Sequence, residues 1–459
     1  MRGCLGKEVP VSKCFRGYEP DQMLLMPVSL LEWLSPDHLA YFISDVVDSL
    51  DLWAILARYE GEQRGYPPYH PRMMVKVLLY AYCIGVPSSR KIERRLEEDI
   101  AFRVLAANNT PDFRTISDFR KEHLGALAGL FLQVLKLCQK AGLVKLGHVS
   151  LDGTKVKANA SKHKAMSYGR MKDEEARLEG EVRDLLRRAQ AVDEEEDRRH
   201  GKNNRGEELP RELALRESRL QKIREARAAL EAEAKDTASR ASAEGKGHPG
   251  GPEDRAQRSF TDPDSRIMPA PGGKDFLQAY NAQAAVDSAH QIIVAAEVTN
   301  EPVDRGQALP MLKAVEDNTG SLPQEVSADA GYFSTRVVTE LKAMAVEPFI
   351  PPNKTRHTAS LPPAPRGRIP RALSVIDRMR RKLRTRRGRK RYALRMKTVE
   401  PVLGQIKHGR GFRQFLLRGL ERVSSEWRLI CTGHNLLKLF RAQSQGLMGL
   451  KVQAMALAR

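Results

Sequence analysis

Residues 165–258 form a long stretch dominated by Glu, Arg, Lys and Ala, and this stretch separates two segments of β-strand character. Apolar residues in "ARLEGEVRDLLRRA" and "LALRESRLQKIREARAALEAEA" recur every three or four positions, which is typical of a helical hairpin or a coiled coil. "HGKNNRGEELP" predicts a turn between the two helices, and "SAEGKGHPGGPEDRAQ" predicts a flexible connection after them. We therefore predict that 165–258 is a helical insertion in another domain.

The segments around the insertion have the alternation and composition of β-strands. "VSLDGTKVKA" (149–158) precedes it, and "FLQAYNAQAAVD" (276–287) and "QIIVAAEVTN" (291–300) follow it as a predicted hairpin. "EVSADAGYFS" (325–334) repeats the first pattern, because an apolar strand again ends in an aspartate. These segments predict an α/β domain over 145–164 and 259–445, followed by a tail over 446–459.

The N-terminal part, 1–140, is predicted to be all-α. "PRMMVKVLLYAYCIGV" (71–86) has Pro at a plausible first turn and Gly near its end, as helix boundaries prefer. "RKIERRLEEDIAFRVLAA" (90–107) continues with helical spacing, and a third helix is expected from Thr115. Such a domain can present Arg and Lys to a DNA groove. A bundle that only packs or dimerises agrees with these residues equally well.

The charge of the chain indicates its partner. The formal net charge is +20 and the sequence pI is about 9.8, so the protein attracts polyanions, of which nucleic acid is the leading candidate. No run of about 18 apolar residues predicts a membrane span, and the first 20 residues lack the apolar centre of a signal peptide. We expect a cytoplasmic protein with no membrane partner. The five dispersed cysteines predict neither a disulfide framework nor a zinc site.

Three carboxylates are candidate metal ligands: Asp152 and Asp329 at predicted strand ends, and Glu400 on a predicted helix directly after the basic stretch 378–397. Carboxylate oxygens suit Mg²⁺ or Mn²⁺. Two such ions about 3.5–4 Å apart can catalyse displacement at a phosphodiester. An aspartate after a strand is often only a turn residue, so the hypothesis depends on the three acids together.

At these residues the chain resembles the DDE transposases of bacterial insertion sequences. The resemblance rests on "SLDGTKVKANAS", "DPDSRIM", "YNAQAAVD", "SADAGYFS" and "VEPVLGQIKH", and upstream on "PPYHPRMMVKVLLYAYCIGVPSSRKIE" and "TPDFRTISDFRK". It implies a ribonuclease-H-like mixed sheet with flanking helices, in which Asp152, Asp329 and Glu400 converge on two Mg²⁺ or Mn²⁺ ions. It also implies cleavage at the terminal inverted repeats of the element and joining of the 3′-hydroxyl ends to target DNA, in a bacterial cytoplasm and at the nucleoid.

One branch of these transposases carries a signature of Tyr, Arg, Glu and Lys around the last acid. The spacing from Glu400 to Lys407 matches it and places both on one helix face, two turns apart, so that Lys407 points at a phosphate. Tyr392 and Arg395 stand one residue too far from Glu400. On a continuous helix the extra residue turns these side chains by about 100°, and Lys397 is then the alternative phosphate contact.

Other polar residues have weaker assignments. Asn281 and Gln283 alternate with Ala on one strand, so one strand face either looks into the site or satisfies buried backbone groups. Asp304 and His434 fit capping or core roles better than ligand roles. Lys155 is expected to extend a basic, DNA-binding surface beside Asp152.

We therefore expect a metal-dependent transposase, acting as a homodimer on DNA because two element ends must be brought together. An inactive DNA-binding protein derived from a transposase is the first alternative. It is opposed by the presence of all three acids and Lys407, and favoured by the shifted Tyr392 and Arg395. A metal-dependent nuclease without strand transfer is the second alternative.

Overall fold

The structure is a computed structural model. It describes residues 29–59, 68–161, 165–200, 209–243, 251–270, 275–353, 363, 366–368, 370 and 372–446. Of the predicted C-terminal tail, only Gly446 lies within these ranges, and residues 1–28 of the predicted N-terminal domain lie outside them.

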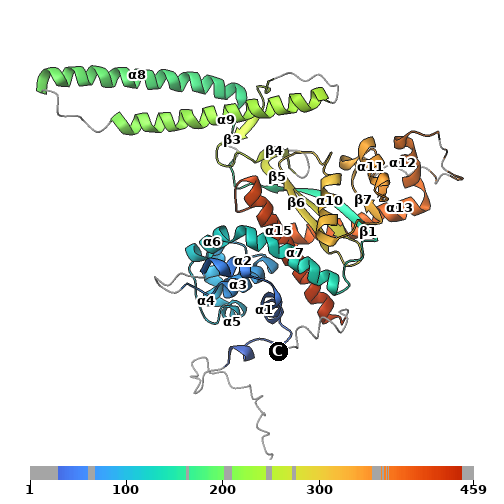
Figure 1. The fold of residues 1–459 in the computed structure, drawn as a ribbon. Helices are drawn as coiled ribbons and strands as arrows, with labels where there is room; N and C mark the ends of the chain where they lie inside the picture. The colour runs from blue at the N-terminus through green and yellow to red at the C-terminus, as the bar shows by residue number, and fades with distance from the viewer. Residues whose placement is uncertain are drawn as a thin grey trace, which may run out of the picture.

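A six-stranded mixed sheet forms the centre of the fold (Figure 1). Strand β1 pairs antiparallel with β5 on one side and parallel with β7 on the other. β4 and β6 are antiparallel to β5, and β8 is parallel to β7. The bounds are β1 His148–Lys157, β4 Arg266–Pro269, β5 Phe276–Asp287, β6 Ile293–Thr299, β7 Glu325–Ser327 and β8 Glu347–Phe349. The predicted hairpin is confirmed as β5–β6, and the mixed sheet is compatible with a ribonuclease-H-like fold.

Helices connect and flank these strands. α10 (Ala308–Thr319) joins β6 to β7, and α11 (Thr335–Ala343) joins β7 to β8. The chain after β8 continues through α12 (Val375–Arg384), α13 (Arg386–Tyr392), η5 (Ala393–Lys397), α14 (Val399–Gly404), η6 (Gln405–Gly409) and α15 (Leu420–Ser444). α10 and α15 both contact β6, and α14 contacts β1 and β5.

The N-terminal part is helical, as predicted. Its elements are η1 (Leu30–Glu32), α1 (Leu39–Ser49), α2 (Trp53–Leu56), η2 (Ala57–Tyr59), α3 (Pro71–Cys83), α4 (Ser89–Glu98), α5 (Ile100–Leu105), α6 (Phe113–Glu122) and α7 (Leu124–Lys140). The predicted helix over 90–107 is divided at Asp99, whose side chain caps α5 by accepting the Ala101 N–H. The third helix begins at Phe113, two residues before the predicted start, because Asp112 caps it.

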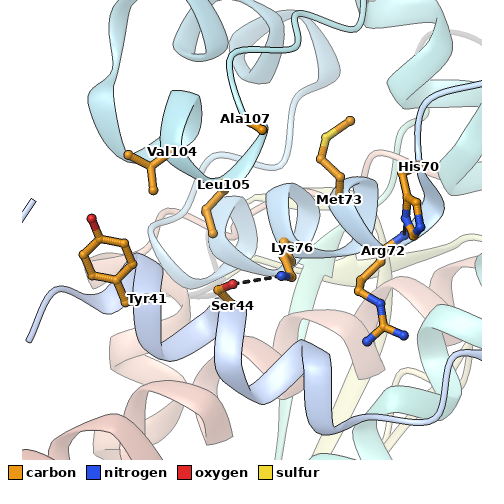
Figure 2. A pocket seen from close by; sticks show the side chains of 9 residues that line it. All are labelled: Tyr41, Ser44, His70, Arg72, Met73, Lys76, Val104, Leu105 and Ala107. Atoms are coloured by element: carbon orange, nitrogen blue, oxygen red, sulfur yellow. Dashed lines mark hydrogen bonds between the residues drawn. The ribbon is translucent and has the colours of Figure 1, made fainter. Parts of the chain in front are cut away.

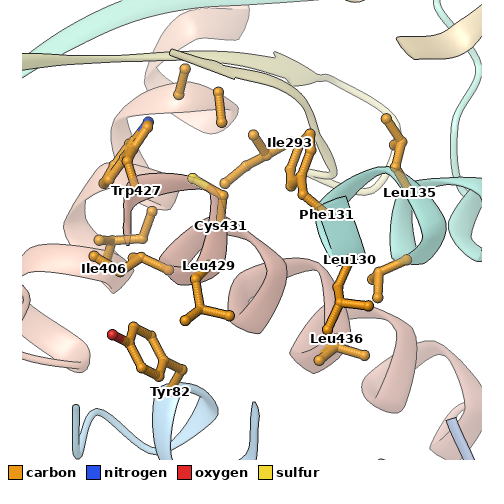
Figure 3. Close-up of a cluster of buried hydrophobic side chains, with 14 of the residues drawn as sticks. Tyr82, Leu130, Phe131, Leu135, Ile293, Ile406, Trp427, Leu429, Cys431 and Leu436 are labelled. Carbon is orange, nitrogen blue, oxygen red and sulfur yellow. The ribbon is translucent and has the colours of Figure 1, made fainter. Parts of the chain in front are cut away.

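Helix α15 is buried between the N-terminal helices and the sheet. Figure 3 shows its side chains Trp427, Leu429 and Leu436 among Tyr82 of α3, Phe131 of α7 and other apolar residues. Trp427 is fully buried, and its indole N–H donates to the carbonyl of Gln283 on β5. One continuous apolar core therefore includes both the N-terminal helices and the sheet.

The insertion is a helical hairpin, as its periodicity predicted. α8 (Tyr168–His200) and α9 (Leu209–Ala243) lie side by side and project away from the sheet (Figure 1). A small sheet of β2 (Ala165–Ser167) and β3 (Gln257–Ser259) closes its base. A separate apolar cluster holds the helices together, and Glu175 on α8 pairs with Arg224 and Arg227 on α9.

The loop after α3 gives a stability prediction. Gly85 has φ +79°, and a Cβ there would lie 2.3 Å from the carbonyl oxygen of Arg410. We expect Gly85→Ala to lower the free energy of unfolding by about 3 kcal/mol, from left-handed strain of about 1–2 kcal/mol and from displacement of the Arg410 backbone. Gly142→Ala is the matched control, since Gly142 has φ +76° but no atom closer than 4.0 Å to that Cβ. Equal losses in urea unfolding of the two variants would contradict the packing argument.

Candidate active site

Asp152 lies in the middle of β1, not at its end as the sequence predicted. The strand that ends near Asp152 is the neighbouring β7, which pairs only with residues 148–150 of β1. Asp152 therefore follows the buried part of the strand at the point where one side of β1 becomes open. On the other side, Asp152 remains paired with Ala284 of β5, which fixes its backbone.

The Asp152 carboxylate is largely buried and has two partners. One oxygen, Oδ1, accepts the Gly153 N–H at 2.9 Å, and Oδ2 accepts from the Arg395 guanidinium at 2.9 Å. The pKa of Asp152 is raised to about 6: burial is the main cause, the Arg395 guanidinium opposes it, and the negative charge of Asp329 adds to the rise. The fold thus holds a carboxyl group in a position that disfavours its ionised form.

Asp329 follows β7, the strand parallel to β1. Its Oδ1 accepts the Gly331 N–H at 2.8 Å and caps the short helix η4 (Ala330–Tyr332). Ser150 and Ser327 are register partners, so Asp329 stands beside Asp152 at the same edge of the sheet. The strand order therefore brings together two acids that are far apart in the sequence.

Arg395 connects Asp152 to the third acid, Glu400. Its Nη2 lies 2.9 Å from Asp152 Oδ2 and 4.0 Å from Glu400 Oε1, and its Nη1 donates to the Tyr392 hydroxyl at 3.3 Å. Arg395 is buried, whereas the side chain of Glu400 is 48% exposed. Tyr392, Arg395 and Glu400 therefore all reach the same edge of the sheet as Asp152.

The expectation that the extra residue turns Tyr392 and Arg395 away is wrong, because no continuous helix joins them to Glu400. α13 changes to the 3₁₀-helix η5, and Thr398 leaves helical geometry at φ −112°, ψ −84° before α14 begins. A 3₁₀-helix has fewer residues per turn than an α-helix, and the break at Thr398 resets the direction of the chain. Both features absorb the additional residue.

Glu325 fixes α13 against the sheet. Its Oε1 lies 3.1 Å from Arg387 Nη2, and its Oε2 lies 3.0 Å from Arg391 Nε. His148, at the start of β1, contacts the same carboxylate: its Nδ1 lies 3.3 Å from Glu325 Oε2. The helix that leads to Arg395 is thereby anchored to the two strands that carry Asp152 and Asp329.

The sequence predicted that Glu400 and Lys407 share one face of a regular helix. This prediction is wrong, because α14 gives way to the π-helix η6 between them. The Nζ of Lys407 donates to Thr154 Oγ1 at 2.9 Å and to the carbonyl of Lys155 at 3.0 Å. The ammonium therefore sits beside β1, two residues beyond Asp152. Lys397, at the end of η5, is exposed.

Lys155 points into the protein and not onto a basic surface. Its side chain is 17% exposed, and its Nζ lies 3.7 Å from Asp304 Oδ1. Asp304 was assigned a capping or core role from the sequence, but its carboxylate accepts from Asn281 Nδ2 at 2.7 Å and from Gln283 Nε2 at 2.8 Å. The alternation of Asn281 and Gln283 on β5 was the sequence signal that could have indicated this role of Asp304, because it places two amide donors on one strand face, where they can share an acceptor. His434, by contrast, is buried in α15 and bonds the carbonyl of Gln291, which is a core role.

The donor types at this edge suit Mg²⁺ or Mn²⁺, because they are carboxylate oxygens. Among the described residues, no three carboxylate, imidazole or thiol groups lie close enough together to bind one ion. Arg395 and Lys155 instead place positive charges next to the acids. In chemical type, the residues fit a divalent cation.

A second feature lies in the N-terminal helices. Figure 2 shows a pocket of about 330 Å³ lined by residues of α1, α3 and α5 and their connections. Lys76 and Arg72 line it, and both pair with the carboxylate of Asp48, at 2.9 and 3.4 Å. None of the acids discussed above lines this pocket, so it is separate from the candidate active site.

Two families match the chain. Residues 28–122 match a family described as a transposase domain (DUF772), and residues 368–440 match the transposase DDE domain. Both matched families are transposase families, and together they support a DDE transposase of insertion sequences. The second match covers Tyr392, Arg395, Glu400 and Lys407, whereas Asp152 and Asp329 lie outside both. No curated protein and no solved structure matches the chain.

These matches support a transposase, which acts on DNA, and a DNA partner agrees with the net charge of +20. DDE transposases generally use divalent metal ions. In the parts of the transposase that the structure describes, no helix is long and apolar enough to cross a membrane.

The buried carboxyl of Asp152 gives a pH prediction. Its pKa is raised from an ordinary value of about 4 to about 6, so its stabilising contribution is complete below pH 4 and is lost as the pH rises through 6. Without divalent ions, Asp152→Asn should therefore gain thermal stability relative to the wild type between about pH 4 and pH 7. Differential scanning fluorimetry in EDTA measures this difference. A difference that does not change with pH would refute the raised pKa.

Proposed function

We propose that this transposase cleaves the ends of its insertion sequence and joins the 3′-hydroxyl ends to target DNA, with a ribonuclease-H-like domain that uses two Mg²⁺ or Mn²⁺ ions. The observation that carries the proposal is the position of Arg395, which links Asp152 to Glu400 beside the strand end that leads to Asp329. Acids from β1, from the segment after β7 and from α14 thus lie along one edge of the sheet.

Asp152, Asp329 and Glu400 are the residues proposed to hold the ions. Bound divalent ions would activate the attacking oxygen and stabilise the leaving oxygen of the phosphodiester. Arg395 keeps the Asp152 carboxylate oriented and pairs it with positive charge, while Tyr392 supports the guanidinium from the other side. The exposed side of Glu400 leaves the site open toward solvent, where DNA can approach.

Basic residues beside the acids are proposed to bind the DNA backbone. Lys407 and Arg395 lie inside the site, and the exposed residues Lys397, Arg386 and Lys390 extend the positive charge along η5 and α13. This arrangement supports a Tyr, Arg, Glu and Lys signature, because Tyr392 and Arg395 reach Asp152 despite their shifted spacing.

The N-terminal helices are proposed to recognise the terminal inverted repeats. Lys76 and Arg72 line the pocket there, and both pair with the Asp48 carboxylate. A homodimer on DNA, in the bacterial cytoplasm at the nucleoid, is the proposed working state. Two element ends have to be held together, and twofold symmetry is the simplest way to do so.

The inactive DNA-binding alternative loses its main support in this arrangement. The shifted spacing of Tyr392 and Arg395 was the one mark in its favour, and the break at Thr398 accommodates it. A nuclease without strand transfer would use the same acids and is distinguished by its products.

Cleavage and joining test the proposal directly. The purified transposase is incubated with Mg²⁺ or Mn²⁺ and labelled DNA that carries the ends flanking its gene, and the products are separated on a gel. We expect cleaved and joined products from the wild type, and none from Asp152→Asn, Asp329→Asn or Glu400→Gln, because each substitution removes a carboxylate charge. All three variants should still bind the DNA.

The outcomes separate the three functions. A wild type that binds the ends tightly but never cuts them with either ion would support the inactive DNA-binding protein. Cleavage without joined product would support the nuclease. Full strand transfer by any one variant would remove that residue from the site.

The basic face of α13 gives a salt-dependence prediction. Arg386 and Lys390 are exposed and four residues apart, so they lie on one helix face. We expect Arg386→Ala combined with Lys390→Ala to weaken binding of any DNA sequence and to reduce the slope of log K against log salt by about two. Lys313→Ala on the exposed side of α10 is the control and should leave the slope unchanged.

A further inference from the structure

The Lys155 ammonium is in an unusual position for a lysine next to a DNA-processing site. Its Nζ is buried and has no hydrogen-bond partner among the described residues, and its nearest carboxylate oxygen, Asp304 Oδ1, is 3.7 Å away. Burial lowers the pKa of Lys155, and the negative charges of Asp304, Asp329 and Asp152 oppose that effect. Three aspartates therefore act on one internal cation.

Asp304 is held rigidly on the side that faces Lys155. Its Oδ1 accepts two hydrogen bonds, from Asn281 and Gln283, and Gln283 in turn accepts a hydrogen bond from the Tyr332 hydroxyl. Asn281 is fully buried and is the register partner of Lys155, and its Oδ1 has no hydrogen-bond partner within the described chain. The side chains of β5 thus fix the Asp304 carboxylate beside the lysine.

Two glycines make room for this arrangement. A Cβ on Gly153, the residue after Asp152, would lie 2.5 Å from Asp304 Oδ1 and 2.4 Å from Gln283 Nε2. A Cβ on Gly331 would lie 2.9 Å from Asp329 Oδ1 and 3.4 Å from Asp304 Oδ2. Asp304 therefore lies directly against the backbone segments that carry both aspartates of the proposed metal site.

From this geometry, and resting on the proposed function, we propose that Lys155 is a resident counter-ion of the acid cluster and that Asp304 is the positioning residue that holds it. The ammonium offsets the repulsion between Asp152 and Asp329 in the metal-free protein. Asp304 draws part of that positive charge away from the two metal-binding acids. A divalent cation that binds to Asp152 and Asp329 is repelled by the Lys155 ammonium. Lys155 and Asp304 together therefore set the affinity of the site for the metal.

This arrangement predicts opposite effects from the two members of the pair. Lys155→Met keeps the length of the side chain and removes the charge, so it should tighten Mn²⁺ binding by at least about fivefold. Asp304→Asn releases the Lys155 charge to act on Asp152 and Asp329, so it should weaken Mn²⁺ binding by a similar factor. In the double variant, the effect of Asp304→Asn should largely disappear.

The experiment measures Mn²⁺ binding to the full chain without DNA, by isothermal titration calorimetry and by electron paramagnetic resonance of the free ion. Lys157→Met is the matched control, because Lys157 lies on the same strand and is exposed. Its Mn²⁺ affinity should equal that of the wild type. Thermal unfolding of every variant identifies any that fail to fold, and Lys155→Gln replaces Lys155→Met in that case.

The results distinguish this inference from the proposed function. A wild type that binds no Mn²⁺, with or without DNA, overturns both. A wild type that binds Mn²⁺, together with a folded Lys155→Met or Lys155→Gln variant whose affinity is unchanged or weaker, overturns the counter-ion role alone. An equal effect of Asp304→Asn in the wild-type and Lys155→Met backgrounds overturns the role of Asp304 in holding the lysine.

Discussion

Burial of α15 between the sheet and the N-terminal helices is the constraint on which the rest of this transposase depends. The helix is apolar on more than one side, so it has to be covered by both parts of the chain. Trp427 ties it to β5, and Arg410 donates to the carbonyls of Tyr82 and Ile430, joining the end of η6 to α3 and α15. The strands that carry Asp152 and the segment that carries Glu400 therefore take their relative positions from one packed core.

Much of the architecture could be predicted because it rests on local patterns. Alternation in 276–299 predicted the β5–β6 hairpin, and three-to-four periodicity predicted α8 and α9. The position of Asp152 within β1 could not be predicted, because a strand does not reveal where its neighbour stops. β7 is only three residues long, and its pairing with β1 decides which part of that strand is open.

The three candidate acids could be picked out from the sequence, whereas the positions of the cations around them could not. The spacing predicted that Arg395 points away from Glu400, because that prediction supposes a regular helix between them. The backbone at Thr398 is not helical. The sequence predicted that Lys155 extends a basic surface beside Asp152, but its side chain is 17% exposed and its ammonium lies 3.7 Å from the Asp304 carboxylate. Both differences arise from contacts between residues distant in sequence, which a local pattern does not contain.

The position of the insertion also affects how the protein folds. β1 and β5 are adjacent strands, yet the whole α8–α9 hairpin lies between them in the chain. The entropy lost on closing a loop grows only with the logarithm of its length, by about 0.6 kcal/mol for each doubling. Helices that pair locally also form early, and α8–α9 brings its own two ends together at the β2–β3 base. A hairpin folded in this way shortens the search that β1 and β5 must make, so the central strands can pair almost as if a short turn joined them.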